Sequence, residues 1–458
     1  MYLQSAKSLS TLLLILLLCG CDAGGAVDTV KQLWQFRQEF PDVSPLILLD
    51  INQQEEQVPA YELPPLLGSV TGKPIKSVQQ WQSNREELLA QFSEHIYGQT
   101  PGKLLSVQSR VVESGRLALN GKAQRQQVEL DIQGHKVIVL IYRPNNVSEP
   151  VPAFLGLNFR GNHTISDEHS VLLTESWVRK EEEHGVLSNR ATDANRGYRV
   201  RRYPLEMIID RGYALVTAYY GDFYPDHGGG LVNSVHGLFR NDNNAAEWGA
   251  IGAWSWGMSR ILDYLEENQG VDASRVVAIG HSRLGKASLW AAAQDLRFAA
   301  AISNNSGAVG AALSRRQFGE TVKIITAMFP HWFTAEFKNY AGQEGNLPVD
   351  QHQLIALLAP RPVYVASASE DSWADPRGEF LATRAAAEVY RLYGMATSEF
   401  SAMPAAGEAL AGPIAYHLRA GKHDLLDFDW RHFLDFADCY VVAKACCTDS
   451  NERRGQCT

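Results

Sequence analysis

The sequence has no excess of basic residues and no cysteine between residues 22 and 438. Its 458 residues include 42 Lys and Arg against 51 Asp and Glu, which gives a formal charge of −9 at pH 7. Proteins that bind nucleic acid usually carry a basic patch or stripe. The charge balance therefore excludes nucleic acid as an expected partner.

The first residues have the pattern of an export signal. Lys7 is followed by an apolar run over 12–18, which is too short to cross a bilayer. The next residues, Leu18-Cys19-Gly20-Cys21, are similar to a bacterial lipobox, in which a small residue precedes an acylated cysteine. We expect an exported protein, periplasmic or at the cell surface, tethered to a membrane through lipidated Cys21. The alternative is cleavage nearby and release as a soluble protein.

The remaining cysteines lie within the last twenty residues, at Cys439, Cys446, Cys447 and Cys457. Export makes disulfides available to them. Four cysteines allow three pairings, and the sequence does not choose between these, although the adjacent Cys446 and Cys447 are not expected to pair. No histidine follows Cys439, so a disulfide-stapled tail is favoured over a metal site.

Composition divides the chain into four parts. A signal peptide is expected over 1–21, and a polar stretch over 22–80, broken by several prolines, reads as a tether and N-terminal wrap. One catalytic domain without internal repeats is expected over 81–440. The cysteine-containing tail occupies 441–458.

Short apolar runs bounded by turn residues alternate with helical patterns through the central domain. The runs are typical of strands buried on both faces of a parallel sheet, and they lie at 153–157, 213–219, 276–279, 299–302 and 363–366. Helical patterns lie at 81–97, 248–267, 284–294 and 378–393. An edge hairpin is expected over 128–142. The alternation predicts a doubly wound α/β domain, with helices on both faces of a mostly parallel sheet.

The sharpest motif is a β-branched strand that runs through Gly280-His281-Ser282 directly into a helix. This is the outline of a nucleophile elbow, in which a tight turn projects a serine hydroxyl above the sheet. The second glycine, Gly285, lies three residues after the serine, whereas the usual motif has it two residues after. The motif predicts Ser282 as a nucleophile.

A hydrolase with such an elbow requires an acid after a later strand and then a histidine. The predicted strand 362–368 exits into a loop with three acids, among which Asp371 has the expected position and Glu370 is the nearest rival. His423 lies in a glycine-containing loop before a terminal helix over 430–436. We expect His423 to accept the Ser282 proton while Asp371 orients the imidazole. The order of the three residues predicts the α/β-hydrolase fold, a three-layer αβα sandwich.

The segment Gly280-His-Ser-Arg-Leu-Gly-Lys286 resembles the signature of the glucuronoyl esterases, carbohydrate esterase family 15. Further motifs of the resemblance, in order along residues 80 to 437, are 158–162, 213–217, 248–254, 315–320, 358–362 and 373–376. The resemblance implies that Arg283, through its N–H and guanidinium, stabilises the oxyanion of the tetrahedral intermediate. It also implies that Lys286, Glu320 and Trp373 bind the glucuronate ring.

The chain departs from the fungal members at two positions. Asn305 occupies the place of their triad glutamate, so the resemblance to bacterial members implies that the acid is Asp371. His281 replaces a cysteine that is disulfide-bonded near the histidine in fungal members, so that disulfide is absent.

These motifs predict a serine esterase that hydrolyses the ester between (4-O-methyl-)glucuronic acid of glucuronoxylan and lignin alcohols, through an acyl-enzyme on Ser282. No metal or organic cofactor is expected, and the protein is expected to be a monomer. One alternative is a broader carbohydrate carboxylesterase, such as an acetyl-xylan esterase. A second alternative is a carbohydrate-binding protein on a decayed hydrolase scaffold.

Overall fold

A computed structural model describes residues 43–68, 74–102, 105–239 and 248–443. Residues 1–52 and 53–458 form two separate compact units. The predicted signal peptide, the predicted lipidation site Cys21 and three of the four tail cysteines lie outside the described residues. The fourth, Cys439, is disulfide-bonded.

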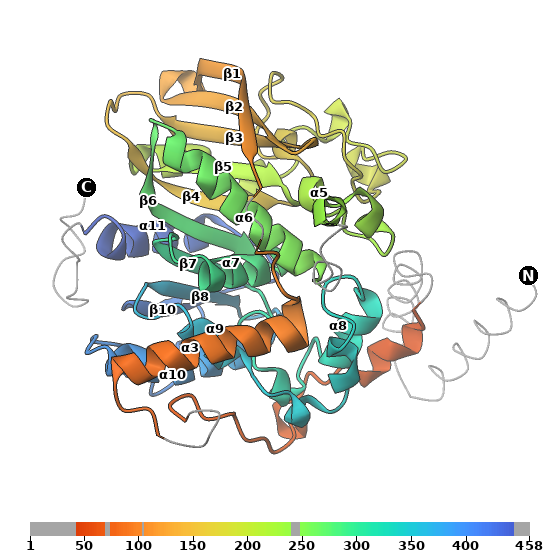
Figure 1. Ribbon diagram of the computed structural model, residues 1–458, viewed down its shortest axis with the longest axis vertical. Helices are drawn as coiled ribbons and strands as arrows, with labels where there is room; N and C mark the ends of the chain where they lie inside the picture. The colour runs from red at the N-terminus through yellow and green to blue at the C-terminus, as the bar shows by residue number, and fades with distance from the viewer. Residues whose placement is uncertain (1–42, 69–73, 103–104, 240–247, 444–458) are drawn as a thin grey trace, which may run out of the picture. The chain divides into compact units, whose positions relative to one another are not determined.

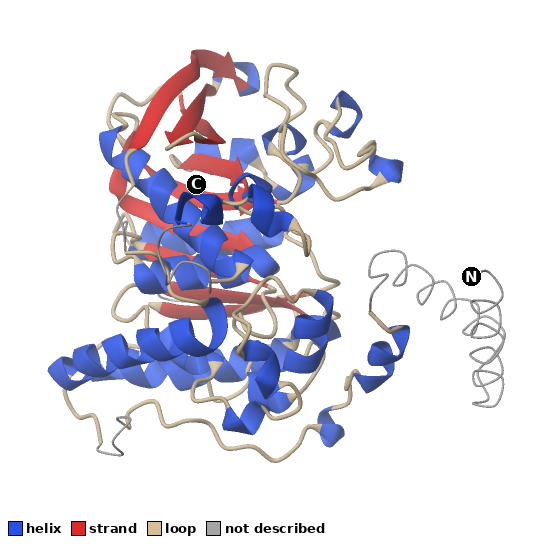
Figure 2. Ribbon diagram, turned by 45° about the vertical axis from the view of Figure 1, so that its right-hand side comes forward, coloured by secondary structure: helices blue, strands red, loops and turns tan. Residues whose placement is uncertain are grey.

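One ten-stranded sheet runs through the larger unit (Figures 1 and 2). Its strands are β1 (Val107–Ala118), β2 (Ala123–Ile132), β3 (His135–Pro144), β4 (Val151–Asn158), β5 (Ala214–Tyr219), β6 (Val271–His281), β7 (Ala300–Asn304), β8 (Val363–Ala368), β9 (Glu408–Leu410) and β10 (Ile414–Arg419). They are ordered β1-β2-β3-β5-β4-β6-β7-β8-β10-β9. The strands from β5 to β10 in this order are mutually parallel, and both margins are antiparallel.

The parallel strands are buried because helices cover both faces of the sheet. Every residue of β4, β5, β7, β8 and β10 is buried. This burial explains why these segments are nearly continuous apolar runs rather than alternating patterns. The predicted strands of the parallel sheet are confirmed. The predicted hairpin is formed by β2 and β3, but it is not at the edge of the sheet, because β1 pairs with β2 outside it.

The helices are α3 (Val78–Phe92), α4 (Leu205–Asp210), α5 (Tyr220–Phe223), α6 (Ala250–Glu267), α7 (Arg283–Gln294), α8 (Val322–Met328), α9 (Gln351–Ala356), α10 (Pro376–Leu392) and α11 (Asp427–Tyr440). Figure 1 shows α6 and α7 in front of the sheet, and α11 on its other side. Each predicted helical pattern corresponds to a helix with bounds shifted by a few residues. The predicted three-layer α/β-hydrolase fold is confirmed.

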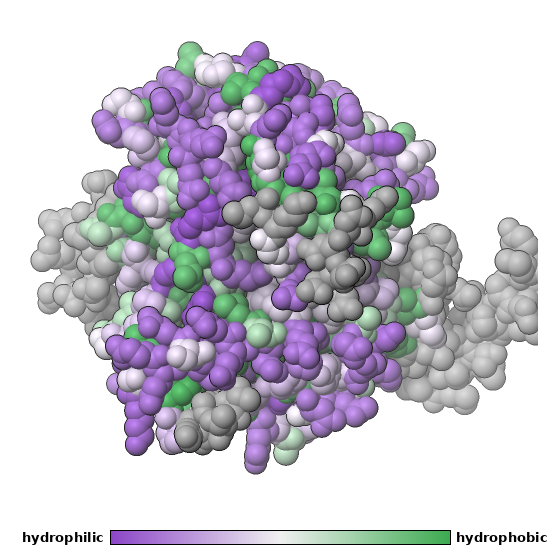
Figure 3. All heavy atoms as spheres, viewed as in Figure 1, coloured by the Kyte–Doolittle hydropathy of each residue, from purple (hydrophilic) through white to green (hydrophobic). Residues whose placement is uncertain are grey.

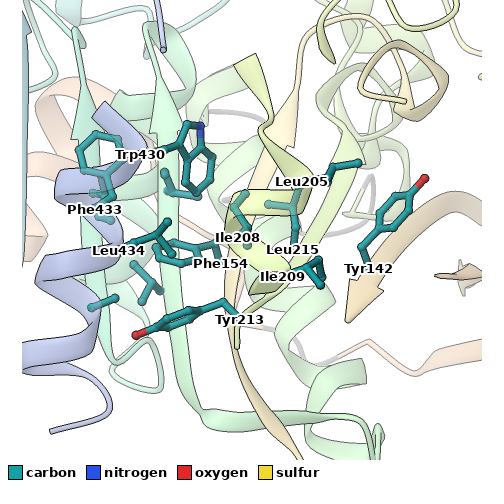
Figure 4. Packing of buried hydrophobic residues seen from close by; sticks show 14 of the residues in the cluster. Tyr142, Phe154, Leu205, Ile208, Ile209, Tyr213, Leu215, Trp430, Phe433 and Leu434 are labelled. Carbon is teal, nitrogen blue, oxygen red and sulfur yellow. The ribbon is translucent and has the colours of Figure 1, made fainter. Parts of the chain in front are cut away.

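An apolar cluster joins α4 and α11 to the sheet (Figure 4). Trp430 of α11 packs edge-on against Phe154 of β4, with 5.4 Å between ring centroids, and its indole N–H donates to the carbonyl of Arg202 at 2.9 Å. Ile208 of α4 belongs to the same cluster. Burying large side chains like these contributes about 1.5–3 kcal/mol each. The cluster therefore holds the start of α11, and with it the preceding loop that carries His423.

The face of the protein shown in Figure 3 is mostly hydrophilic, with hydrophobic side chains scattered over it. None of the helices within the described ranges has the length and apolar character needed to span a bilayer.

Candidate active site

Ser282 stands at the junction of β6 and α7 with backbone angles φ 58° and ψ −132°. A serine rarely adopts this conformation, and such strain is typical of functional sites. A Cβ on Gly280 would lie 1.9 Å from the carbonyl oxygen of Leu284, so only glycine permits the helix to turn back so closely. The Ser282 N–H donates to the Asn304 carbonyl at 2.8 Å, which ties the elbow to the end of β7.

Ser282 is also the N-cap of α7. The first N–H groups of a helix have no acceptor within the helix, and its N-terminus carries a partial positive charge. The backbone of Arg283 begins the helix at this point. The serine is therefore placed beside donors that suit a developing oxyanion.

His423 and Asp371 lie together although 52 positions separate them. The His423 Nδ1 is 2.6 Å from Asp371 Oδ2, while the Asp371 side chain is 3% exposed and that of His423 is 36% exposed. The buried carboxylate accepts a hydrogen bond from Nδ1–H, which leaves Nε2 as the basic nitrogen. Glu370, the rival acid, has an exposed side chain.

Arg419 binds the loop that carries His423. The Arg419 guanidinium donates to the carbonyls of Ala420, Lys422 and Asp424 at 2.9, 2.8 and 3.1 Å. Arg419 is itself paired at 3.0 Å with Asp429, which is fully buried. Three carbonyls on one planar guanidinium fix the loop geometry on both sides of the histidine.

His281 packs against His423, with ring centroids 4.5 Å apart, in the position where fungal members have a cysteine. Its Nδ1 lies 2.6 Å from the side-chain oxygen of Asn304. Burial, followed by the charge of His423, lowers the pKa of His281 well below its ordinary value. A neutral imidazole therefore lies beside the proposed base.

Asn305 occupies the end of β7, where the fungal acid is expected, and its amide donates to Asp371 Oδ2 at 2.9 Å. An amide carries no charge and cannot balance an imidazolium. Asp371, in the loop after β8, therefore has two donors, the His423 ring and the Asn305 amide.

Arg283 extends from the elbow over the faces of Trp332 and Phe329, with its guanidinium carbon 4.7 and 5.1 Å from the ring centroids. Its Nη1 donates to Asp226, a fully buried carboxylate in the loop after β5. Burial by itself raises the pKa of Asp226, but the charge of Arg283 and the bond from His331 outweigh it and hold the pKa well below its ordinary value. Arg283 is therefore a fixed cation.

The three residues predicted to bind the sugar are connected in space. Lys286 Nζ donates to Glu320 Oε2 at 3.0 Å, and the Glu320 N–H donates to the Trp373 carbonyl at 2.9 Å. Lys286 also donates to the carbonyls of Ser306 and Ala308, at 2.6 Å each. Lys286 and Glu320 are 2% and 6% exposed, whereas Trp373 is half-buried. Burial lowers the pKa of Lys286, and the Glu320 charge opposes the shift.

Beneath this group lies Glu379 of α10, which is fully buried. It accepts from the Gly307 N–H at 2.9 Å and from the hydroxyls of Ser306 and Ser367. Burial raises its pKa to about 8, and the nearby Asp371 adds to the rise. The surroundings of Glu379 thus oppose its ionisation.

The sequence reasoning missed Asp226, Glu379 and Arg419. Asp226 and Arg419 stand at or just beyond the carboxyl ends of parallel strands, where ligand sites of open α/β sheets lie. Their position after these strands could have identified both as candidate site residues. Glu379 lies inside a helix, and its position in the sequence gave no such indication. In the described part of the chain, no group of three or more His, Cys, Asp or Glu side chains could hold a metal ion.

The arrangement supports nucleophilic acyl transfer. A serine on an elbow, a histidine whose Nδ1 is held by a buried acid, and a helix N-terminus with an adjacent guanidinium are the parts that such chemistry requires.

Comparisons with known proteins agree with this chemistry. The family model described as glucuronyl esterase of fungi matches residues 207–394. The chain is 43% identical over 406 residues to the carbohydrate esterase MZ0003 of an unknown prokaryotic organism, covering 86% of this chain and 93% of that protein. It is 32% identical over 173 residues to 4-O-methyl-glucuronoyl methylesterase 1 of Wolfiporia cocos, which covers 36% of this chain and 42% of the fungal protein.

Among solved structures, the glucuronoyl esterase from Solibacter usitatus is 40% identical, covers 84% of this chain and 99% of that chain, and superposes with a TM-score of 0.79. These findings confirm the resemblance on which the sequence predictions rested. The chain belongs to the glucuronoyl esterases of carbohydrate esterase family 15 and has their α/β-hydrolase fold.

Proposed function

We propose that this esterase hydrolyses the ester between the carboxyl carbon of (4-O-methyl-)glucuronic acid on glucuronoxylan and a lignin alcohol. The catalytic residues are Ser282, His423, Asp371 and Arg283. The 2.6 Å contact between His423 and Asp371 carries the assignment of base and acid, because it holds the imidazole of the only sequence-predicted base in one tautomer. The names of the fungal and bacterial relatives support the glucuronoyl ester.

In the first half of the reaction, Ser282 Oγ attacks the ester carbonyl carbon while His423 Nε2 takes the hydroxyl proton. The carbonyl oxygen becomes an oxyanion that faces the Arg283 N–H and guanidinium. The bond from carbon to the alcohol oxygen then breaks, and the departing alcohol receives the proton from His423. The uronate remains as an acyl group on Ser282.

In the second half, water replaces the alcohol. It attacks the acyl carbon, gives its proton to His423 Nε2, and forms a second oxyanion at the same place. When the bond to Ser282 Oγ breaks, the serine recovers the proton and uronic acid leaves. Asp371 stays ionised throughout and stabilises the imidazolium in both halves.

Lys286, Glu320 and Trp373 are proposed to bind the glucuronate ring. The support is that Lys286 bonds the Glu320 carboxylate and that the Glu320 backbone is bonded to that of Trp373. Glutamate accepts from hydroxyls, and an indole offers an apolar face and an N–H donor. Lys286 and Glu320 are both buried, so Trp373 is the most accessible of the three side chains.

The test is hydrolysis of benzyl glucuronate and of 4-nitrophenyl acetate by the full-length chain. We expect kcat/KM to favour the glucuronate ester and to fall by at least about 10³-fold in Ser282→Ala. The matched control is Ser274→Ala, an exposed serine at the opposite end of β6, which should keep full activity. Preference for the acetate would retain the triad but move the substrate to the broader carbohydrate carboxylesterase.

The sugar contacts are tested with Glu320→Gln and Trp373→Ala on the same two esters. If these residues bind the ring, kcat/KM falls about tenfold or more for the glucuronate ester and stays unchanged for the acetate ester. An equal loss on both esters would show that the residues only support the fold.

We also propose that Cys21 is lipidated, that the enzyme is exported and membrane-tethered, and that it acts as a monomer. Metabolic labelling with a palmitate analogue should mark the wild type and not Cys21→Ala. Labelling of both, or of neither, would contradict the lipid anchor.

The monomeric state is tested by sedimentation in detergent, which should give the mass of one chain.

A further inference from the structure

We propose that Asp226 is a positioning residue for catalysis, which holds the Arg283 guanidinium where the oxyanion forms. The inference rests on the proposed role of Arg283. It assigns a function to a buried charge that lies outside the triad and outside the sugar-binding group.

The contacts of Asp226 are unusually numerous for one carboxylate. The side chain is fully buried, and Arg283 Nη1 donates to its Oδ2. The Tyr220 hydroxyl donates to Oδ2 at 2.9 Å, while the Trp332 indole N–H and His331 Nε2 reach Oδ1 at 2.7 and 2.8 Å. Both oxygens are therefore held by donors from other segments, so the carboxylate cannot rotate without breaking several bonds.

These donors come from three separate parts of the fold. Asp226 and Tyr220 follow β5, Arg283 begins α7 after β6, and His331 and Trp332 follow α8. Trp332 acts twice, because its N–H binds the carboxylate while its ring lies 4.7 Å under the Arg283 guanidinium carbon. The arginine is thus fixed by a charge at one nitrogen and by an aromatic face below.

A free arginine side chain has many rotamers, and most of them would carry the charge away from the reacting carbonyl. Fixing the guanidinium in advance removes the entropic cost of ordering the side chain when the oxyanion forms. Asp226 shares its negative charge with a second cation, Arg179, whose Nη2 is 3.9 Å from Oδ2. Arg283 consequently keeps positive charge available for the oxyanion while its position is held.

The experiment is a double-mutant cycle on kcat for the glucuronate ester, using Asp226→Asn, Arg283→Ala and the combination. We expect kcat to fall about 10²–10³-fold in Arg283→Ala and about 10–100-fold in Asp226→Asn, with KM little changed. In the combination, Asp226→Asn should add nothing to the loss from Arg283→Ala, because a positioning residue acts only through the residue that it positions.

The matched control is Asp350→Asn. Asp350 is also fully buried and paired with an arginine, Arg315, at 3.2 Å, but it lies outside the proposed machinery. Its loss should lower the melting temperature and leave kcat per folded enzyme unchanged. A fall in kcat that is equal in Asp350→Asn and Asp226→Asn would assign both to stability alone and overturn the inference.

Three further outcomes are decisive. If Arg283→Ala keeps its kcat, the proposed oxyanion role fails and the inference fails with it. If Arg283→Ala is slow but Asp226→Asn is not, or if the two losses multiply in the combination, only the inference is overturned.

If Asp226→Asn does not fold, Trp332→Phe and Tyr220→Phe each remove one donor to Asp226 and keep an aromatic side chain at the position. They should lower kcat by about two- to tenfold in the wild type and not at all with Arg283→Ala; equal losses in both backgrounds would overturn it.

Discussion

Two fully buried carboxylates lie near this active site, and their pKa values are shifted in opposite directions. Asp226 stands on the Arg283 side with a pKa well below its ordinary value, whereas Glu379 stands under the loop after β7 with a pKa raised to about 8. Burial alone raises the pKa of both. The comparison shows that neighbours, rather than depth, decide whether a buried acid is charged.

The neighbours differ in kind. Asp226 meets Arg283 and His331 directly, so its charge is matched. Glu379 meets two hydroxyls and one N–H, while the charge of Asp371 lies near enough to oppose its ionisation. Lys286 is paired with Glu320 rather than with Glu379. Asp226 therefore ionises readily beside Arg283, whereas ionisation of Glu379 is opposed beside Asp371.

The largest expected effect compares the catalytic contribution of Asp371 with that of Arg283. Asp371→Asn should lower kcat about 10⁴-fold, because the imidazolium loses its charged partner and the wrong tautomer is favoured. This exceeds the 10²–10³-fold loss expected for Arg283→Ala. Steady-state kinetics on the glucuronate ester checks both, with Glu370→Gln as the exposed neighbouring control. A larger loss in Glu370→Gln than in Asp371→Asn would exchange their roles.

The second prediction concerns the buried ion pair of Lys286 and Glu320. Lys286→Met should destabilise the protein by about 3–5 kcal/mol, because Glu320 is left as a buried charge without its partner. The combination with Glu320→Gln should recover part of that loss. Urea unfolding at pH 7 measures both. Equal stability of the single and double variants would mean that the pair carries no coupling.

The smallest expected effect depends on pH. The pKa of Glu379 is raised in the folded protein, so the folded state binds the extra proton between about pH 4.5 and 8, and the stability contributed by this group falls as pH rises through that window. Glu379→Gln mimics the protonated acid. It should be more stable than the wild type by about 3 kcal/mol at pH 7 and by under about 1 kcal/mol at pH 5.

Thermal or urea unfolding at the two pH values checks this difference. The control is Asp226→Asn. The pKa of Asp226 is lowered rather than raised, so this variant should not become more stable relative to the wild type as pH rises. A Glu379→Gln difference that does not change with pH would show that Glu379 is ionised in the folded state.

Much of the fold follows from local pattern. Apolar runs such as 153–157 and 363–366 are buried strands because both of their faces meet helices, and periodic segments such as 378–393 are helices. The region from 159 to 204 had no such pattern, and the structure there is a chain of short 3-10 turns, such as Asn162–Thr164 and Val200–Arg202. Segments of this kind are held by individual tertiary contacts, which periodicity does not encode.

The sequence by itself determined the strand-to-helix elbow at Ser282. It also predicted the order of serine, acid and histidine, with the acid in the loop after β8. Each of these depends on residues close together in the chain or on their order along it. Only the tertiary structure showed that Asp226 binds Arg283, that Asn305 donates to Asp371, and that burial raises the pKa of Glu379. The charge and position of a buried group depend on which donors and acids the fold packs around it, and those partners lie tens to hundreds of residues away.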